Sequence, residues 1–170
     1  MIRAMHDQDL DAIYAIINDA AQAYRGVIPA DRWHEPYMPR DELAQEIAAG
    51  VKFWVYEADG RMTGVMGIQD KGEVALVRHA YVVTALQRKG VGAALLKQVQ
   101  SLTKKPMLIG TWKDATWAIA FYQRNGFALV SERAKEILLR RFWSIPARQV
   151  ETSVVLADQR WIARAGPDEK

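Results

Sequence analysis

A short glycine-bearing segment between two apolar runs constrains this chain more than any other feature. Residues 87–92 read Gln-Arg-Lys-Gly-Val-Gly; the run 80–83 (Ala-Tyr-Val-Val) precedes them and the run 93–96 (Ala-Ala-Leu-Leu) follows. The pattern predicts a strand, a tight loop and the start of a helix in direct succession. Such a junction presents unpaired backbone N–H groups at the positive end of a helix dipole, which suits a phosphate or pyrophosphate.

The loop carries two glycines and two cations. Gly90 and Gly92 let a ligand approach the backbone and permit unusual dihedral angles, while Arg88 and Lys89 add positive charge. A lone Gly-x-Gly after a strand is also common in ordinary tight turns. The loop lacks the Gly-Lys-Ser/Thr of a Walker-type site, which disfavours another nucleotide such as ATP.

A second signal follows in residues 118–127, which read Ala-Ile-Ala-Phe-Tyr-Gln-Arg-Asn-Gly-Phe. Together the two stretches resemble the GNAT superfamily of acyl-CoA N-acyltransferases. In that family a [Gln/Arg]-x-x-Gly-x-[Gly/Ala] loop binds the coenzyme A pyrophosphate, and a later Ala-x-x-[Phe/Leu]-Tyr-x-x-x-Gly-Phe lies beside the thioester. The resemblance is tight over residues 73–131 and loose outside them. The matching positions are Gln87, Gly90 and Gly92 in the loop, then Ala118, Phe121, Tyr122, Gly126 and Phe127.

The resemblance implies which residues hold coenzyme A. The backbone of Val82 and Val83 corresponds to a strand that pairs with the pantetheine arm, much as an added strand would. Family members often have an asparagine where this chain has Ala115; the neighbouring Asp114 is predicted to cap the helix or to contact the coenzyme. The remaining implied contacts come from Gln87, Arg88, Lys89, Gly90, Val91, Gly92, Ala93, Phe121 and Tyr122.

The resemblance also implies a reaction: transfer of an acetyl group from acetyl-CoA to an amine of a small molecule or peptide within a ternary complex. This chemistry needs a neutral nucleophile, donors for an oxyanion and a proton for the departing thiolate. Tyr122 matches the position of a general acid in many members. The chain has no cysteine, which excludes an acyl-cysteine intermediate. A coenzyme A-binding sensor or interaction module without catalysis is the alternative.

The general base is less evident. Members with an obvious base often carry a Glu or His on the fourth strand, at positions that correspond here to Leu76 and Arg78. Strand alternation puts His79 on the opposite face unless a bulge re-aims it; a histidine of the core or the sheet edge is the alternative. Glu73, at the strand start, can act through a water, and His34 is a third candidate. An acceptor amine of low pKa needs no strong base.

Acceptor recognition is expected in the variable parts of the chain. The segment 24–39 contains three prolines and no clear period, yet it is rich in aromatic side chains. We expect these aromatics to line the acceptor pocket or to anchor irregular loops to the core. The stretch 140–143 (Arg-Arg-Phe-Trp) has the same two interpretations, and its arginines can also complement a helix C-terminus. The residues in question in the first segment are Tyr24, Trp33, His34 and Tyr37.

The order of elements predicts an α/β fold of the GNAT type. Antiparallel hairpins up to residue 83, followed by strand–helix–strand–helix–strand, give a mixed, mostly antiparallel central sheet of about six to seven strands flanked by helices. We expect one domain over residues 1–163 and a loose tail over 164–170. Strands are expected at 2–5, 51–56, 62–69, 73–83, 106–111, 127–131 and 150–157. Helices are expected from 7 or 9 to 20 and at 41–49, 115–124 and 133–143, and the glycine-bearing loop and the helix that follows it span 87–104.

Bulk composition sets the remaining expectations. A formal charge of +3 and a pI near 9.2 are too mildly basic to argue for nucleic acid. The N-terminal residues lack the apolar core of a signal peptide, and no apolar run approaches the ~18–20 residues that cross a bilayer. With no cysteine, the chain suits a reducing compartment, so we expect a cytoplasmic protein with no membrane partner and no metal. The resemblance also makes a homodimer an option.

Overall fold

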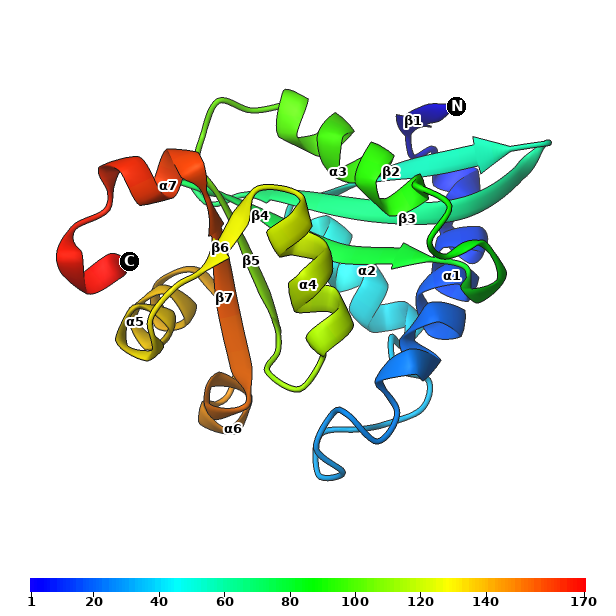
Figure 1. Cartoon of the computed structure of the whole chain (residues 1–170). Helices are drawn as coiled ribbons and strands as arrows, with labels where there is room; N and C mark the ends of the chain where they lie inside the picture. The colour runs from blue at the N-terminus through cyan, green and yellow to red at the C-terminus, as the bar shows by residue number, and fades with distance from the viewer. The chain divides into compact units, whose positions relative to one another are not determined.

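The computed structural model describes all 170 residues. Seven strands form a sheet in the order β1-β2-β3-β4-β5-β7-β6, and helices flank it. This confirms the predicted α/β class and the predicted number of strands (Figure 1). The chain divides into two compact units, which are described separately below. The first unit comprises residues 1–25, 33–70 and 77–104, and the second comprises 26–32, 71–76 and 105–170.

The first unit is built on a hairpin of two long strands. Its elements, in chain order, are β1 (Ile2–Ala4), the 3₁₀ helix η1 (Asp7–Asp9), α1 (Leu10–Ala21), η2 (Gln22–Tyr24), α2 (Arg40–Ala48), β2 (Val51–Ala58), β3 (Arg61–Asp70), residues 77–82 of β4 (Ala75–Val82), η3 (Thr84–Leu86) and α3 (Val91–Ser101). β2 pairs antiparallel with both β1 and β3. The hairpin turns at Asp59 and Gly60, both at positive φ, as a two-residue Asp-Gly turn requires.

Helices pack on both faces of this hairpin (Figure 1). Ile13 and Ile17 of α1 and Leu43 of α2 form one core with Phe53 and Val65 of the two strands. This arrangement follows from the helical spacing of apolar residues in α1 and from the alternation in β2.

On the other face, α3 begins directly against β3. A Cβ on Gly64 would lie 2.8 Å from Val91 Cγ1 and 3.1 Å from Leu95 Cδ1. Only a glycine therefore allows the helix start to approach the strand this closely. Gly64 thus fixes where the N-terminus of α3 sits in the first unit.

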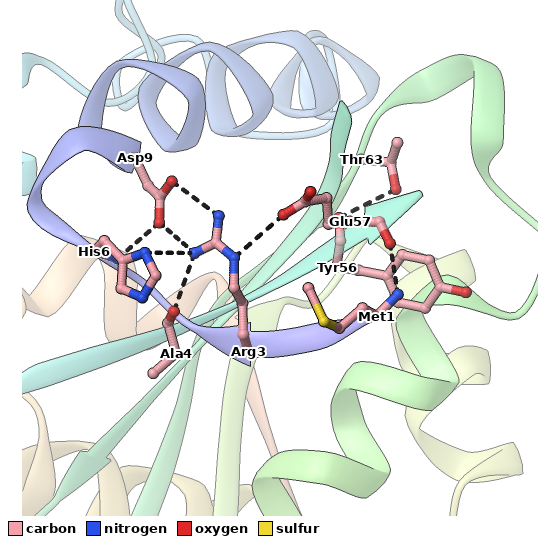
Figure 2. A network of polar contacts seen from close by, with 8 residues as sticks. All are labelled: Met1, Arg3, Ala4, His6, Asp9, Tyr56, Glu57 and Thr63. Carbon is pink, nitrogen blue, oxygen red and sulfur yellow. Dashed lines mark hydrogen bonds and ion pairs between the residues drawn. The ribbon is translucent and has the colours of Figure 1, made fainter. Parts of the chain in front are cut away.

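A polar network secures the N-terminal strand (Figure 2). Arg3 donates to both carboxylate oxygens of Asp9, at 2.6 and 3.1 Å, and its Nε donates to Glu57 at 3.2 Å. Asp9 also accepts from the backbone N–H of His6 at 2.7 Å. The hydrogen bond from Arg3 lowers the pKa of the buried Asp9 to about 2, against the opposing effect of burial.

The second unit contains the other half of the sheet. Its elements are β5 (Met107–Trp112), α4 (Thr116–Arg124), β6 (Phe127–Leu129), α5 (Glu132–Phe142), α6 (Ala147–Glu151), β7 (Ser153–Asp158), α7 (Gln159–Arg164) and the 3₁₀ helix η4 (Pro167–Glu169). β7 pairs antiparallel with both β5 and β6. Leu138 and Phe142 of α5 and Trp161 of α7 pack into one core with Leu108 and Val155 of the strands.

The structure differs from the sequence prediction chiefly in the C-terminal region. The strand expected at 150–157 begins at Ser153, because residues 147–151 form α6, which was not predicted. α7 was also not predicted; Asp158 starts it by accepting a hydrogen bond from the Trp161 N–H at 3.1 Å. In the tail expected to be loose, Glu169 accepts through its carbonyl from Trp161 Nε1 at 2.9 Å. No helix of the structure has the length and apolar character needed to cross a membrane.

Candidate functional site

The glycine-bearing loop forms the predicted junction in the first unit. After β4 the chain makes η3, with Leu86 N–H bonded to Val83 O, and α3 then begins at Val91. Gly90 occupies the N-cap position with φ +83°, and Arg88 has φ +65°. Both values lie in the left-handed region, which allows the backbone to turn sharply into the helix.

The turn leaves a row of backbone donors without partners. The first bond that closes α3 runs from the Ala94 N–H to Gly90 O, and no backbone bond is formed by the N–H groups of residues 88–93. Beside them, Arg88 and Lys89 are exposed. Several unpaired N–H groups at the positive end of a helix, with two cations, fit a diphosphate. The coenzyme A pyrophosphate therefore matches this loop chemically.

Side-chain contacts hold the loop in place. Asp19 of α1 accepts from both the N–H and the hydroxyl of Thr84, at 3.0 and 3.1 Å. Gln87 Nε2 donates to Val82 O at 3.3 Å, and the Val83 N–H donates to Thr63 O at 2.9 Å. The loop is thus tied to its own unit at three points. The N–H of Val83 already has a partner in β3, so any pairing of these valines with a pantetheine arm would use their other backbone groups.

A charged cluster lies between α2 and β4, also in the first unit. Arg78 donates to both oxygens of Glu46, at 2.8 and 2.7 Å, and to Gln69 Oε1 at 2.8 Å. His79 Nε2 is buried and lies 3.3 Å from Glu46 Oε2, without the alignment of a regular hydrogen bond. Burial alone would raise the pKa of Glu46, but its contact with His79 and the charge of Arg78 outweigh this effect and lower that pKa.

The direction of His79 departs from simple strand alternation. Consecutive side chains of a regular strand point to opposite faces, yet Arg78 and His79 both reach Glu46. His79 has φ +50°, a left-handed value for a non-glycine residue inside a strand. The backbone irregularity re-aims His79 toward α2, so the expectation that it lies opposite Arg78 was wrong for this chain.

Aromatic side chains from the irregular segment gather around Tyr81 of β4. The Tyr24 and Tyr37 rings meet the Tyr81 ring edge-on, at 6.3 and 6.2 Å between centroids. Trp33 and His34 stack on Tyr37, at 5.9 and 6.5 Å. The sequence predicted the four aromatics of the segment as a group, and the structure brings them together with Tyr81 as a fifth member. We call these five residues the aromatic cluster.

The second motif lies in the second unit, on α4. Tyr122 is buried, and its ring meets Phe121 at 5.0 Å and Phe127 at 6.0 Å, both edge-on. The aromatic residues of the motif therefore pack against one another. The N-cap residue of α4 is Ala115, and no side chain caps the helix, so the predicted capping role of Asp114 is not observed. Asp114 is exposed, and it contributes only its carbonyl, to the Thr116 N–H.

Glu73, the second candidate base, is engaged in the second unit. Its carboxylate accepts from Arg141 at 2.6 Å, and Arg141 also pairs with Glu169 at 3.2 Å. Arg140, the other arginine of that helix end, is exposed. His34 Nδ1 donates to Pro36 O at 2.8 Å in an exposed position. Among these candidates, only His79 directly contacts a partly buried carboxylate.

Comparison with known proteins identifies the family. Residues 11–139 match the model of the acetyltransferase (GNAT) domain. The chain is 30% identical over 131 residues to the peptidyl-lysine N-acetyltransferase YiaC of Escherichia coli K12, covering 76% of this chain and 84% of that protein. The chain therefore belongs to the GNAT acetyltransferase family and is an N-acyltransferase, which confirms the resemblance noted in its sequence.

Solved structures show the same fold. The PaiA N-acetyltransferase of Thermoplasma acidophilum, solved in complex with coenzyme A, superposes with a TM-score of 0.71 at 17% identity, covering 93% of this chain and 97% of that one. The Escherichia coli ribosomal-protein-S18-alanine N-acetyltransferase gives a TM-score of 0.66 at 18% identity, with coverage of 99% and 97%. At these identities the structures support the fold alone.

Sequence reasoning missed three residues that shape these sites: Glu46, Asp19 and Tyr81. Each acts through a partner that is distant along the chain; Arg78 lies 32 residues from Glu46, and Thr84 lies 65 residues from Asp19. Glu46 and Asp19 read as solvent-facing positions of amphipathic helices, and Tyr81 reads as an ordinary strand residue. No local signal distinguishes them.

Proposed function

We propose that this enzyme transfers an acetyl group from acetyl-CoA to the amine of a small molecule or peptide. The observation that carries the proposal is the row of unpaired N–H groups over residues 88–93 at the start of α3. A diphosphate held there orients the rest of the co-substrate. When bound, acetyl-CoA supplies an activated acyl group. Since the chain has no cysteine, the amine takes this group directly.

The proposed contacts to the co-substrate follow from the family pattern and the loop. The N–H groups of residues 88–93 bind the pyrophosphate, with charge from Arg88 and Lys89. Gln87 supports the loop through Val82 O, and the backbone of Val82 and Val83 serves the pantetheine arm. From the second unit, Phe121, Tyr122 and Asp114 are the proposed contacts on the α4 side.

For the acceptor we propose a primary amine, with a peptidyl lysine as the first candidate. YiaC, to which this chain is 30% identical, is named as a peptidyl-lysine N-acetyltransferase. The aromatic cluster supports the choice, because the faces of tyrosine and tryptophan rings attract an ammonium group. Trp33 and Tyr37 present stacked, partly exposed rings in the first unit. We infer that this cluster binds the acceptor before its amine loses a proton.

Two side-chain roles complete the proposed reaction. Tyr122 donates a proton to the thiolate as the C–S bond breaks, a role within the reach of a phenol hydroxyl. A base accepts the proton that the attacking amine releases. Glu73 and His79 are the candidates, and the contacts of Glu73 with Arg141 favour His79.

The test compares two glycines with similar backbones. Gly90 has φ +83° and Gly60 has φ +69°, and a Cβ at either position would meet no atom within 4 Å. Ala therefore imposes similar backbone strain at both sites, on the order of 1 kcal/mol. Only Gly90→Ala should also obstruct the co-substrate. We expect acetyl-CoA to raise the melting temperature of the wild type and of Gly60→Ala, and to act on Gly90→Ala only at concentrations at least about tenfold higher.

Turnover is measured as release of free thiol with a panel of amines that includes lysine peptides, amino acids and polyamines. The proposal predicts thiol release with at least one member. Binding of acetyl-CoA without turnover across the panel would favour a coenzyme A-binding module. No thermal shift with any acyl-CoA would contradict the proposal itself.

A further inference from the structure

Three charged side chains from distant parts of the chain meet in the first unit. Glu46 near the end of α2 accepts two hydrogen bonds from Arg78 and contacts His79, both in β4. Glu46 and Arg78 are each about one-fifth exposed at the side chain, and His79 is 12% exposed. A glutamate that only anchored a helix would need one cationic partner. The contact of Glu46 with a second partner, the imidazole of His79, therefore needs a further explanation.

The backbone is arranged so that His79 reaches this carboxylate. His79 holds φ +50° within β4, a conformation that the surrounding structure must enforce. The neighbouring strand accommodates it through Gly67, where a Cβ would lie 2.9 Å from Arg78 O. Strained residues of this kind concentrate at functional sites. This backbone conformation lets the His79 side chain contact Glu46. It also places the imidazole beside the Phe53 ring, with 5.9 Å between the ring centroids.

We propose that Glu46 is a positioning residue that holds the Nε2–H of His79, so that Nδ1 is the atom that accepts the proton from the acceptor amine. The inference rests on the proposed function. An orienting carboxylate fixes the tautomer of a catalytic imidazole and stabilises the imidazolium that forms. Arg78 keeps Glu46 ionised and fixes the plane of its carboxylate through two hydrogen bonds.

The contact between His79 and Glu46 fits this role in a free enzyme. The Nε2–Oε2 distance of 3.3 Å is longer than a strong hydrogen bond and poorly aligned. Catalytic hydrogen bonds are often long in the free state and tighten in the complex. Around the ring, Arg78 on the same strand and Glu46 on α2 are the charged groups, Gln69 on β3 is neutral and bonds Arg78, and Phe53 on β2 is apolar.

The acceptor, bound as an ammonium, first releases one proton to solvent and becomes the neutral amine that can attack. His79 Nδ1 takes one proton from the amine nitrogen as that nitrogen bonds to the acyl carbon. The C–S bond then breaks, and the thiolate takes a proton from Tyr122. The imidazolium returns its proton to solvent and the tyrosinate regains one, so the products are an amide and a free thiol.

The experiment uses two variants of Glu46 and a control on the same helix. Glu46→Ala removes the acceptor oxygens, whereas Glu46→Gln keeps an oxygen that can accept from Nε2–H but loses the charge. Glu42→Gln, one turn earlier on α2, removes a carboxylate outside the cluster. For each we measure kcat and KM for both substrates. In the free protein, ¹⁵N chemical shifts of the imidazoles report the tautomer, which is simple to assign because the chain has three histidines.

We expect the wild-type His79 ring, when neutral, to carry its proton on Nε2. Glu46→Ala should lose this preference and lower kcat on the order of 10- to 100-fold, with little change in the KM for acetyl-CoA. Glu46→Gln should keep the tautomer and lose less activity, though clearly more than Glu42→Gln, which should match the wild type. A smaller loss in Glu46→Gln than in Glu46→Ala is the signature of positioning.

Three results would overturn the inference: wild-type kcat in folded Glu46→Ala, wild-type kcat in Glu46→Gln, or a wild-type ring protonated at Nδ1. If Glu46→Ala fails to fold, the other two measurements decide. Absence of turnover in the wild type with every acceptor would instead count against the proposed function. The tautomer measurement on the free protein would then still test the coupling of Glu46 to His79.

Discussion

Two arginine–carboxylate clusters in the first unit share their chemistry and differ in what they hold. Arg3 and Arg78 each bind a carboxylate through two hydrogen bonds, to Asp9 and Glu46 respectively. The Arg3 cluster contains only groups that are satisfied by one another and by the backbone (Figure 2). The Arg78 cluster additionally holds His79, buried and poorly bonded at Nε2 and strained at φ. A saturated ion pair stabilises a fold, whereas one that keeps an incompletely bonded titratable group is available for chemistry.

The Arg3 cluster therefore serves as a structural link. Arg3 of β1 joins η1, through Asp9, to β2, through Glu57, which lies 54 residues away along the chain. The hydrogen bonds from Arg3 and the neighbouring charges raise the pKa of its guanidinium, so it stays protonated at all relevant pH values.

The largest expected difference between the clusters is in catalysis. His79→Asn removes the proposed base but keeps a residue type that tolerates positive φ, so the fold should be retained. We expect kcat to fall about 100-fold or more, the usual contribution of a general base. Thermal unfolding should change little. An unchanged kcat with the preferred acceptor would show that His79 is not the base, and the two clusters would then not differ in function.

The next effect is on stability and belongs to the Arg3 cluster. Asp9→Ala leaves a partly buried arginine without its main partner, which we expect to cost about 2–3 kcal/mol of unfolding free energy. For a chain of this size that lowers the melting temperature by about 5–10 °C. kcat per folded molecule should stay unchanged. Asp7→Ala, an exposed neighbour in η1, is the matched control and should show neither change.

The smallest effect is the pH dependence of the same contact. The pKa of Asp9 falls from 3.8 to about 2 on folding. A depressed carboxyl pKa contributes stability that is present above the unfolded value and is lost as pH falls through the folded value. We therefore expect about 2 kcal/mol of unfolding free energy to disappear between pH 4 and pH 2. Urea unfolding of wild type and Asp9→Ala should converge over this interval; parallel curves would show that Asp9 is not stabilised by folding.

The contrast between the clusters also shows what the sequence could reveal. The loop at 87–92 was predictable because its glycines, its cations and the adjoining helix lie next to one another in the chain. The aromatic segment was predictable as a group for the same reason. The partnership of Glu46 with His79 was not, because it depends on a backbone irregularity in β4 and on where α2 packs. Single-sequence patterns predict alternation and give no sign of where it fails.

The C-terminal region gives a second example. Residues 150–157 alternate poorly, and the β-branched residues Val150 and Thr152 read as the start of a strand. In the structure Val150 instead lies within the short helix α6, and its side chain packs into the core of the second unit, which decides the local conformation. Tertiary packing overrides local preference most easily in elements this short.

We propose that the backbone N–H groups of residues 88–93 bind the diphosphate of the co-substrate. A titration of ¹⁵N-labelled protein with coenzyme A tests it directly, because each of these amides gives its own resonance. We expect the amides of residues 88–93 to shift strongly downfield, as hydrogen bonding to phosphate oxygens requires, and we expect Gly90→Ala to weaken the effect. Binding that shifts other amides while these six stay in place would contradict it.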